Sequence, residues 1–159
     1  MQKPECYAVR ICLGNEEEII FTATDLLADT KLAPELSNEA HYYRAKAYLD
    51  AGKTDGAMED LKILAKDTRN VYGAEAKYKV AQIYFDGGQT DKAEQEVLNY
   101  IEVSTPHTYW LARSFVLLAD VYMKLGRNLD AKQYLLSLKQ NYQADDDIAG
   151  MIESRLEKL

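Results

Sequence analysis

Three stretches of the sequence share one pattern: AKAYLDAGKTDGA at residues 45–57, AQIYFDGGQTDKA at 81–93 and ADVYMKLGRNLDA at 119–131. Each stretch begins with alanine, carries tyrosine three residues later and glycine seven residues later, and ends on another alanine. Gly14 and the three glycines of the pattern are spaced 38, 36 and 38 residues apart. A regular spacing of this length indicates an internal repeat, and a repeat of this kind decides the fold.

The residues on either side of each glycine predict a pair of helices. Apolar side chains precede the glycine at helical spacing, as Ala74, Tyr78 and Ala81 do. Glycine adopts left-handed backbone angles without steric cost, so it ends one helix and lets the chain reverse. We expect the alanines to let two antiparallel helices approach closely and the tyrosines to fill the space between pairs. Polar residues after the turns are expected to cap the second helices: Thr54, Asp55, Thr90, Asp91 and Asn128.

The sequence therefore predicts an all-α protein in which helices and turns alternate. The expected helices cover residues 2–13, 16–31, 36–51, 54–67, 72–87, 90–103, 107–125, 128–142 and 145–158. Asn15 and Glu18 have the spacing of a capping box, and Thr105 with Pro106 predicts a cap followed by proline in the first helical turn. The expected units are a partial or degenerate repeat at 1–33, repeats at 34–69, 70–105 and 106–143, and a capping helix at 144–159.

The recurring pattern of alanine, tyrosine, glycine and alanine resembles the tetratricopeptide repeat. In that repeat a small residue and a tyrosine of the first helix are followed by an alanine of the second helix. The resemblance is clear over residues 36–142 and weaker over 1–33. It implies a right-handed superhelical α-α solenoid ending in a capping helix. The periods of 36 and 38 residues exceed the usual 34, and an extra position before each first helix is shared by Leu36, Tyr72 and Trp110.

By resemblance, the first helices line a concave groove that binds a peptide or protein segment. The groove positions are Glu39, Tyr42, Lys46, Leu49 and Asp50; Glu75, Tyr78, Gln82, Phe85 and Asp86; and Arg113, Val116, Asp120, Met123 and Lys124. Members of the family that clamp a terminal carboxylate use lysine, asparagine and arginine at set positions. Tyr42, Lys46 and Leu117 stand there instead, which disfavours capture of a carboxyl terminus. The acids of the groove suggest a partner with basic and apolar residues.

A second hypothesis from the sequence is a structural one, in which the chain is the end of a longer solenoid that self-associates or packs against another domain. Long-period repeats and the terminal Arg155–Leu159 stretch resemble the carboxyl-terminal part of large cell-envelope repeat proteins of Bacteroidetes. A periplasmic or cell-envelope location follows from that resemblance, with the cytoplasm as the alternative. Apolar residues near the amino end, namely Tyr7, Val9, Ile11 and Leu13, predict a truncated repeat that frays or pairs with a second copy.

The composition and motifs disfavour several other classes of protein. The 26 acidic residues outnumber the 19 Lys and Arg residues, so no nucleic-acid partner is expected. No apolar run is long enough for insertion into a membrane. Cys6 and Cys12 are interpreted as free thiols, and no metal or other cofactor is expected, because His41 and His107 lie far apart in the sequence. The stretch 52–54 lacks the upstream glycine of a phosphate-binding loop, and 145–147 lacks the later ligands of a calcium loop. We expect no enzymatic activity.

Replacing Ala81 by leucine tests the register of the repeat. Ala81 is expected to face the partner helix, so a larger side chain overpacks the interface and lowers the free energy of unfolding by about 1–3 kcal/mol. Thermal melting followed by circular dichroism measures the effect. A variant that melts like the parent chain would place Ala81 away from its partner helix.

Overall fold

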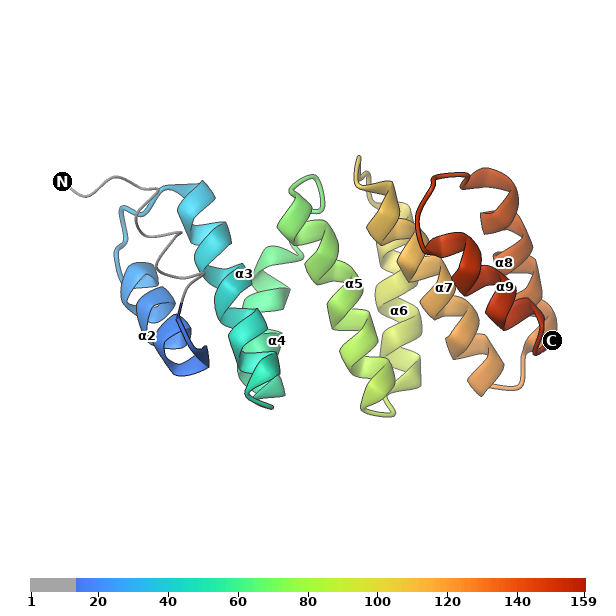
Figure 1. Ribbon diagram of the computed structural model, residues 1–159, viewed down its shortest axis with the longest axis horizontal. Coiled ribbons are helices and arrows are strands. Elements are labelled where there is room, and N and C mark those ends of the chain that lie inside the picture. Colours follow the sequence, from blue (N-terminus) through green and yellow to red (C-terminus); the bar gives the residue numbers. More distant parts are fainter. Residues whose placement is uncertain (1–13) are drawn as a thin grey trace. The chain divides into compact units, whose positions relative to one another are not determined.

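The structure is a computed structural model, and it describes residues 14–159. These residues form helices and turns and contain no strand (Figure 1). The helices are α2 (Glu16–Leu27), α3 (Pro34–Asp50), α4 (Thr54–Leu64), α5 (Val71–Asp86), α6 (Thr90–Glu102), α7 (Thr108–Lys124), α8 (Asn128–Asn141) and α9 (Ile148–Leu156). The predicted all-α class and the helix–turn–helix organisation are confirmed. The right-handed superhelical course stays a prediction, and the helix expected at 2–13 lies outside the described residues.

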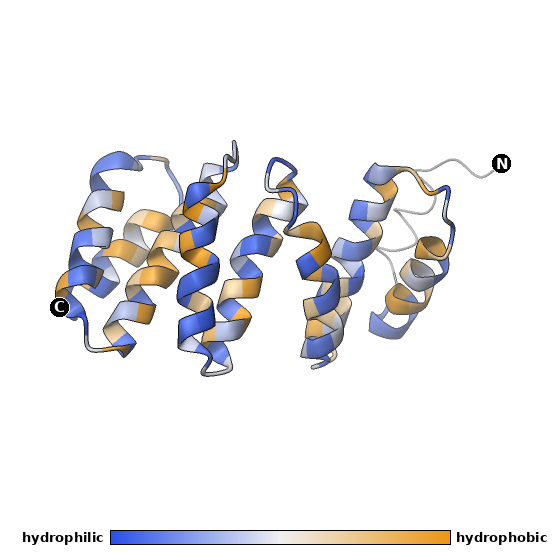
Figure 2. Ribbon diagram, turned by 180° about the vertical axis from the view of Figure 1, so that it is seen from behind, coloured by the Kyte–Doolittle hydropathy of each residue, from blue (hydrophilic) through white to orange (hydrophobic). Residues whose placement is uncertain are grey.

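The chain divides into two compact units, residues 1–76 and 77–159, called here the N-terminal and the C-terminal unit. In the N-terminal unit, α3 contacts both α2 and α4. In the C-terminal unit, α7 contacts α6, α8 and α9. Hydrophobic and hydrophilic residues alternate along the helices of both units, as expected for amphipathic helices (Figure 2).

The three predicted turn glycines have the left-handed conformation. Gly52, Gly88 and Gly126 have φ of 74°, 77° and 74°. The residue after each glycine donates its backbone N–H to the carbonyl of the repeat tyrosine, at 2.7 Å for Lys53 to Tyr48 and at 2.8 Å in both of the other turns. This bond is the outer one of a Schellman motif, which satisfies carbonyl groups that the helix end leaves unpaired.

The alanines of the pattern lie where the paired helices meet. All six are buried, with exposed fractions of 0–1%: Ala45, Ala57, Ala81, Ala93, Ala119 and Ala131. In the C-terminal unit four of them belong to one core together with Leu118 and Leu135, which are both fully buried. A small side chain at each of these positions allows the close helix approach that the sequence predicts.

The second helices begin at the predicted residues, but the predicted caps are wrong. Helices α4, α6 and α8 begin at Thr54, Thr90 and Asn128, so these residues lie inside the first turn, and the preceding residues act as N-caps without side-chain hydrogen bonds. The reason is that a single residue separates the turn glycine from the helix. Pro106 precedes α7 and does not lie within it, because the Thr105 hydroxyl accepts a hydrogen bond from the His107 N–H and forms a turn there.

Aspartate side chains explain two further differences between the predicted and the observed helix ends. Helix α2 ends at Leu27, and the Asp29 carboxylate accepts the Lys31 N–H at 2.9 Å. Helix α9 begins at Ile148, whose N–H donates to the Asp146 carboxylate at 2.9 Å. Such local side-chain bonds give the backbone an alternative to helix. Asn15 caps α2 as predicted, since Glu18 N–H donates to Asn15 Oδ1 at 3.0 Å; the Glu18 carboxylate accepts the side-chain amide of Asn15, in place of the backbone N–H that a capping box uses.

Gly73 is a position that the repeat pattern did not single out and where a side chain is sterically excluded. A Cβ atom there would lie 1.9 Å from the Asp67 carbonyl oxygen and 2.6 Å from that of Leu64. We expect Gly73→Ala to lower the free energy of unfolding by about 2–3 kcal/mol, measured by urea denaturation. Gly150→Ala in α9 is the matched control, because a Cβ there meets nothing within 4 Å. The control should be neutral or stabilising, and equal effects of both changes would contradict the predicted close contact at Gly73.

Candidate functional site

Four of the predicted groove residues of the C-terminal unit are joined in one hydrogen-bonded chain. The Arg113 guanidinium donates to the Tyr78 hydroxyl at 2.9 Å, and that hydroxyl donates to Gln82 Oε1 at 2.9 Å. Gln82 Nε2 in turn donates to the Asp86 carboxylate at 2.8 Å. The four side chains come from α5 and α7, so the contact between these helices aligns them. The predicted positions are thus brought together, while their role in binding stays a prediction.

The chain of bonds extends beyond Arg113 to the start of α9. Arg113 donates to the Tyr109 hydroxyl at 3.1 Å, and this hydroxyl donates to the Asp147 carboxylate at 3.0 Å. The guanidinium also lies 4.9 Å from the centre of the Tyr78 ring, within the range of a cation–π contact. Burial lowers the pKa of Arg113, but the hydrogen bonds from its guanidinium to Tyr109 and Tyr78 outweigh burial and raise it. The cation is therefore fixed in place by its neighbours.

Other predicted groove residues of this unit have different surroundings. Phe85 and Met123 are half-buried against the core, and the Lys124 ammonium lies 5.3 Å from the centre of the Phe85 ring. Val116 is buried, so it presents no side chain to a partner. The two carboxylate oxygens of Asp120 accept hydrogen bonds from Arg155 of α9, at 2.7 and 2.9 Å. Asp120 thus fixes the last helix to α7, a contact that the sequence pattern did not predict.

In the N-terminal unit, the predicted groove residues lie on α3. Lys46 and Asp50 are exposed, whereas Tyr42 and Leu49 are half-buried. The Lys46 ammonium lies 5.4 Å from the centre of the Tyr42 ring. Burial and the hydrogen bond to the Glu75 carboxylate both raise the pKa of the Tyr42 phenol far above its usual value. Tyr42 is therefore a neutral hydrogen-bond donor at physiological pH.

Tyr42 and Tyr78 occupy equivalent places, ten residues before their turn glycines, and each contacts the next repeat in the same way. The Tyr42 ring packs on that of Tyr72, with centroids 4.5 Å apart, and the Tyr78 ring packs on Trp110 at 5.7 Å. The hydroxyl groups bond to Glu75 and Arg113, which are also equivalent to one another. The extra position shared by Tyr72 and Trp110 therefore forms an aromatic joint between successive first helices.

A buried ionic cluster in the N-terminal unit was missed by the sequence reasoning. Asp60 of α4 is fully buried, and its carboxylate accepts hydrogen bonds from Arg44 at 2.6 and 2.8 Å. His41 Nδ1 lies 2.7 Å from the same carboxylate, and Arg44 also donates to the Thr24 hydroxyl of α2. Burial alone would raise the pKa of Asp60, but the hydrogen bonds from Arg44 and His41 outweigh it and lower the pKa below its usual value. The cluster links α2, α3 and α4.

The same place in the other repeats holds different side chains. His41 and Asp60 stand eleven residues before and eight residues after their turn glycine. Lys77 and Glu96 are the equivalents in the next repeat and form an ion pair at 2.9 Å. Phe115 and Tyr134 follow in the third repeat, with ring centroids 6.1 Å apart. A comparison of these paired positions along the sequence would have shown the complementary charges.

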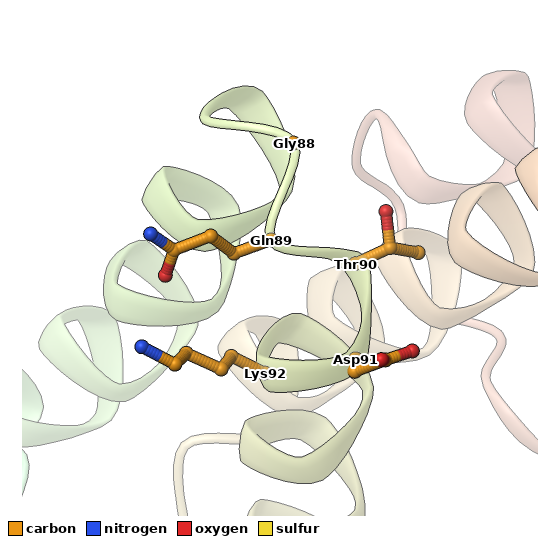
Figure 3. A pocket seen from close by; sticks show the side chains of 5 residues that line it. All are labelled: Gly88, Gln89, Thr90, Asp91 and Lys92. Atoms are coloured by element: carbon orange, nitrogen blue, oxygen red, sulfur yellow. The ribbon is translucent and has the colours of Figure 1, made fainter.

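A hollow of about 320 Å³ lies beside the turn between α5 and α6. It is lined by Gly88, Gln89, Thr90, Asp91 and Lys92. Figure 3 shows Gln89 and Lys92 pointing to one side while Thr90 and Asp91 point to the other. Since a small-molecule site requires polar groups that converge, we assign no ligand to this hollow.

No cofactor or metal is assigned to the described part of the chain. Within residues 14–159, no three His, Cys, Asp or Glu side chains are placed to hold a metal ion. Cys6 and Cys12 lie outside the described residues, as do Tyr7, Val9, Ile11 and Leu13 of the predicted truncated end. No helix in the described range has both the length and the apolar composition required to cross a bilayer.

The paired helices, the left-handed glycines and the aromatic joints define a helical-repeat protein. Two segments of the chain match models of the tetratricopeptide repeat, residues 39–67 and 112–141. These two segments are therefore tetratricopeptide repeats. The matched segments cover most of the helix pairs α3–α4 and α7–α8, whereas the predicted boundaries of the individual repeats stay predictions. No curated protein and no solved structure matches the chain.

Replacing Asp60 by asparagine tests the buried cluster. The change leaves Arg44 without its anionic partner, and we expect a loss of about 2–4 kcal/mol in the free energy of unfolding near neutral pH. Because the pKa of Asp60 is lowered in the folded state, its contribution is complete above the unfolded pKa, close to 3.8, and is lost as the pH falls further. The difference between parent and variant should thus be constant from neutral pH to about pH 5 and shrink below about pH 4.

Two further variants serve as controls for this cluster. Glu96→Gln breaks the equivalent but more exposed pair with Lys77 and should cost only about 1 kcal/mol. The paired change of Arg44→Met with Asp60→Leu should be less destabilising than Asp60→Asn, because no uncompensated charge remains. A parent-to-variant difference that stays unchanged down to pH 2 would contradict the lowered pKa of Asp60.

Proposed function

We propose that this protein is a scaffold that binds a segment of a partner protein along the face of its first helices that carries the predicted groove residues. Tetratricopeptide repeats generally mediate protein–protein interaction, which supports this class of function. The observation that carries the proposal is the hydrogen-bonded chain of Asp86, Gln82, Tyr78 and Arg113. Side chains that are already ordered lose little conformational entropy on binding, so such a surface is prepared for a partner.

The charges on these faces favour a partner segment with basic and apolar residues. On α3, one buried carboxylate oxygen of Glu39 accepts no hydrogen bond from the described residues, and the exposed Asp50 carboxylate has no cation partner among them. On α5, the exposed Asp86 receives a hydrogen bond from the neutral Gln82, its one partner within residues 14–159. Phe85 and Met123 supply half-buried apolar surface in the C-terminal unit. The proposed partner therefore presents Lys or Arg beside apolar side chains.

The sequence resemblance adds a biological setting to this proposal. The chain would act within a large cell-envelope repeat protein of Bacteroidetes, with a periplasmic or envelope location. The structural alternative, in which the repeats self-associate or pack against another domain, is separated from partner binding by the experiment that follows.

Site-specific photo-crosslinking tests the proposed face. A photoreactive amino acid is placed at Phe85 or Met123, and at Gln95, an exposed residue of α6, as the control. We expect crosslinks to a heterologous protein from the first two positions and none from the third. Crosslinks only between copies of this chain, with a solution mass that rises with concentration, would instead support the structural alternative.

The identified partner is then titrated against charge-reversal variants. Asp86→Lys should weaken binding by about tenfold or more, because it replaces an attraction for basic residues by repulsion. Glu102→Lys makes the same change of charge at an exposed site on α6 and should leave the dissociation constant unaltered. Equal effects of the two variants would show that net charge alone governs binding, which would contradict recognition by this face.

A further inference from the structure

The second helix of the third repeat exposes two large apolar side chains on one face. Leu129 is 72% exposed and Leu136 is 46% exposed, both on α8. They are seven residues apart, which places them on the same side of the helix, about 10 Å from each other along its axis. The opposite side of α8 supplies Ala131, Leu135 and Leu138 to the core. The two exposed leucines therefore lie outside the hydrophobic core of their own unit.

Comparison between the repeats shows that the fold does not require a leucine at position 129. The residues three positions after the turn glycine are Asp55, Asp91 and Leu129. An aspartate suits this place, because the first turn of a helix favours negative charge. The residues ten positions after the glycine are Lys62, Leu98 and Leu136. The third repeat alone combines leucine at both positions.

The charge around these leucines is opposite to that of the chain as a whole. The charged residues of α8 are Lys132, Lys139 and one acid, Asp130, whose carboxylate is paired with Arg127, although the chain as a whole contains 26 acidic residues. Lys139 pairs with Glu153 of α9. Lys132 lies between the two leucines in sequence and has no ionic or hydrogen-bonding partner among the described residues. The face formed by Leu129, Lys132 and Leu136 is thus apolar with one free positive charge.

We propose that this face docks an acidic amphipathic helix of a partner protein. A helix fits, because it presents apolar residues seven positions apart to Leu129 and Leu136 and can place a Glu or Asp between them, opposite Lys132. A second copy of the chain fits less well. If two α8 helices paired about a twofold axis with Leu129 against Leu136, both Lys132 side chains would lie beside the axis and repel each other. This inference is independent of the face proposed above.

Two synthetic peptides serve as probes, measured by fluorescence anisotropy with the full chain. Both are amphipathic helices with leucines on one side; one carries glutamates beside them and the other carries lysines. We expect the acidic peptide to bind about tenfold more tightly than the basic one, with an affinity that falls as salt is added. Equal binding of both peptides, or no binding of the acidic peptide, would overturn the proposal.

The decisive variant combines Leu129→Asp with Leu136→Lys, the residues that the first of the three repeats carries at these positions. It should fold normally and lose binding of the acidic peptide by about tenfold or more. Lys132→Glu keeps both leucines and should reverse the preference between the two peptides. Undiminished binding by either variant would refute the assignment. A dimer of the parent chain that the double variant lacks, seen by sedimentation, would identify a second copy as the occupant and refute it equally.

Discussion

The left-handed backbone at Gly52, Gly88 and Gly126 sets the geometry on which the other contacts of each repeat depend. A residue with a side chain is strained at φ near +75°, whereas glycine is not. Glycine therefore allows the chain to reverse in a turn so short that only one residue lies between it and the next helix. The reversal fixes which residues of the two helices meet. The alanines pack at the crossing, and residues eleven before and eight after the glycine form a pair in each repeat. Without this turn, neither set of contacts would be in register.

The repeated pair shows how one geometry accepts different chemistry. In the first repeat the pair is His41 with the fully buried Asp60, which Arg44 also contacts. In the second repeat it is Lys77 with Glu96, and in the third it is two aromatic rings. A buried carboxylate is costly unless it is neutralised, which explains why the fully buried Asp60 receives several hydrogen bonds, while the partly exposed Glu96 has a single ion pair with Lys77. An apolar ring pair avoids that cost. The helix pairs thus share one backbone geometry, but a different type of side-chain contact joins the two helices in each repeat.

Much of the fold could be predicted from the sequence, because the glycines and alanines act through local backbone geometry and close packing. The helix ends were less predictable. Asp29 and Asp146 accept backbone N–H groups in turns, and nothing in the helical periodicity distinguishes this use from a position on a solvent-exposed face. The grouping of Tyr78, Gln82 and Asp86 with Arg113 was predicted only as a shared face. The bonds that join them depend on the contact between α5 and α7, which a pattern within single helices does not contain.

The two proposed faces of the C-terminal unit differ in how they are prepared for a partner. Around Arg113, each polar side chain is already hydrogen-bonded to another, so a ligand would meet ordered groups. The affinity of such a ligand would come mainly from charges complementary to the groups at the two ends of the hydrogen-bonded series. The contact between Asp120 and Arg155 closes part of that surface and holds α9 in place. On α8, by contrast, Leu129 and Lys132 are exposed, and binding there would draw on the removal of apolar surface from water. Recognition at the first face therefore depends on charge and geometry, and recognition at the second depends on apolar contact with a single charge to orient it.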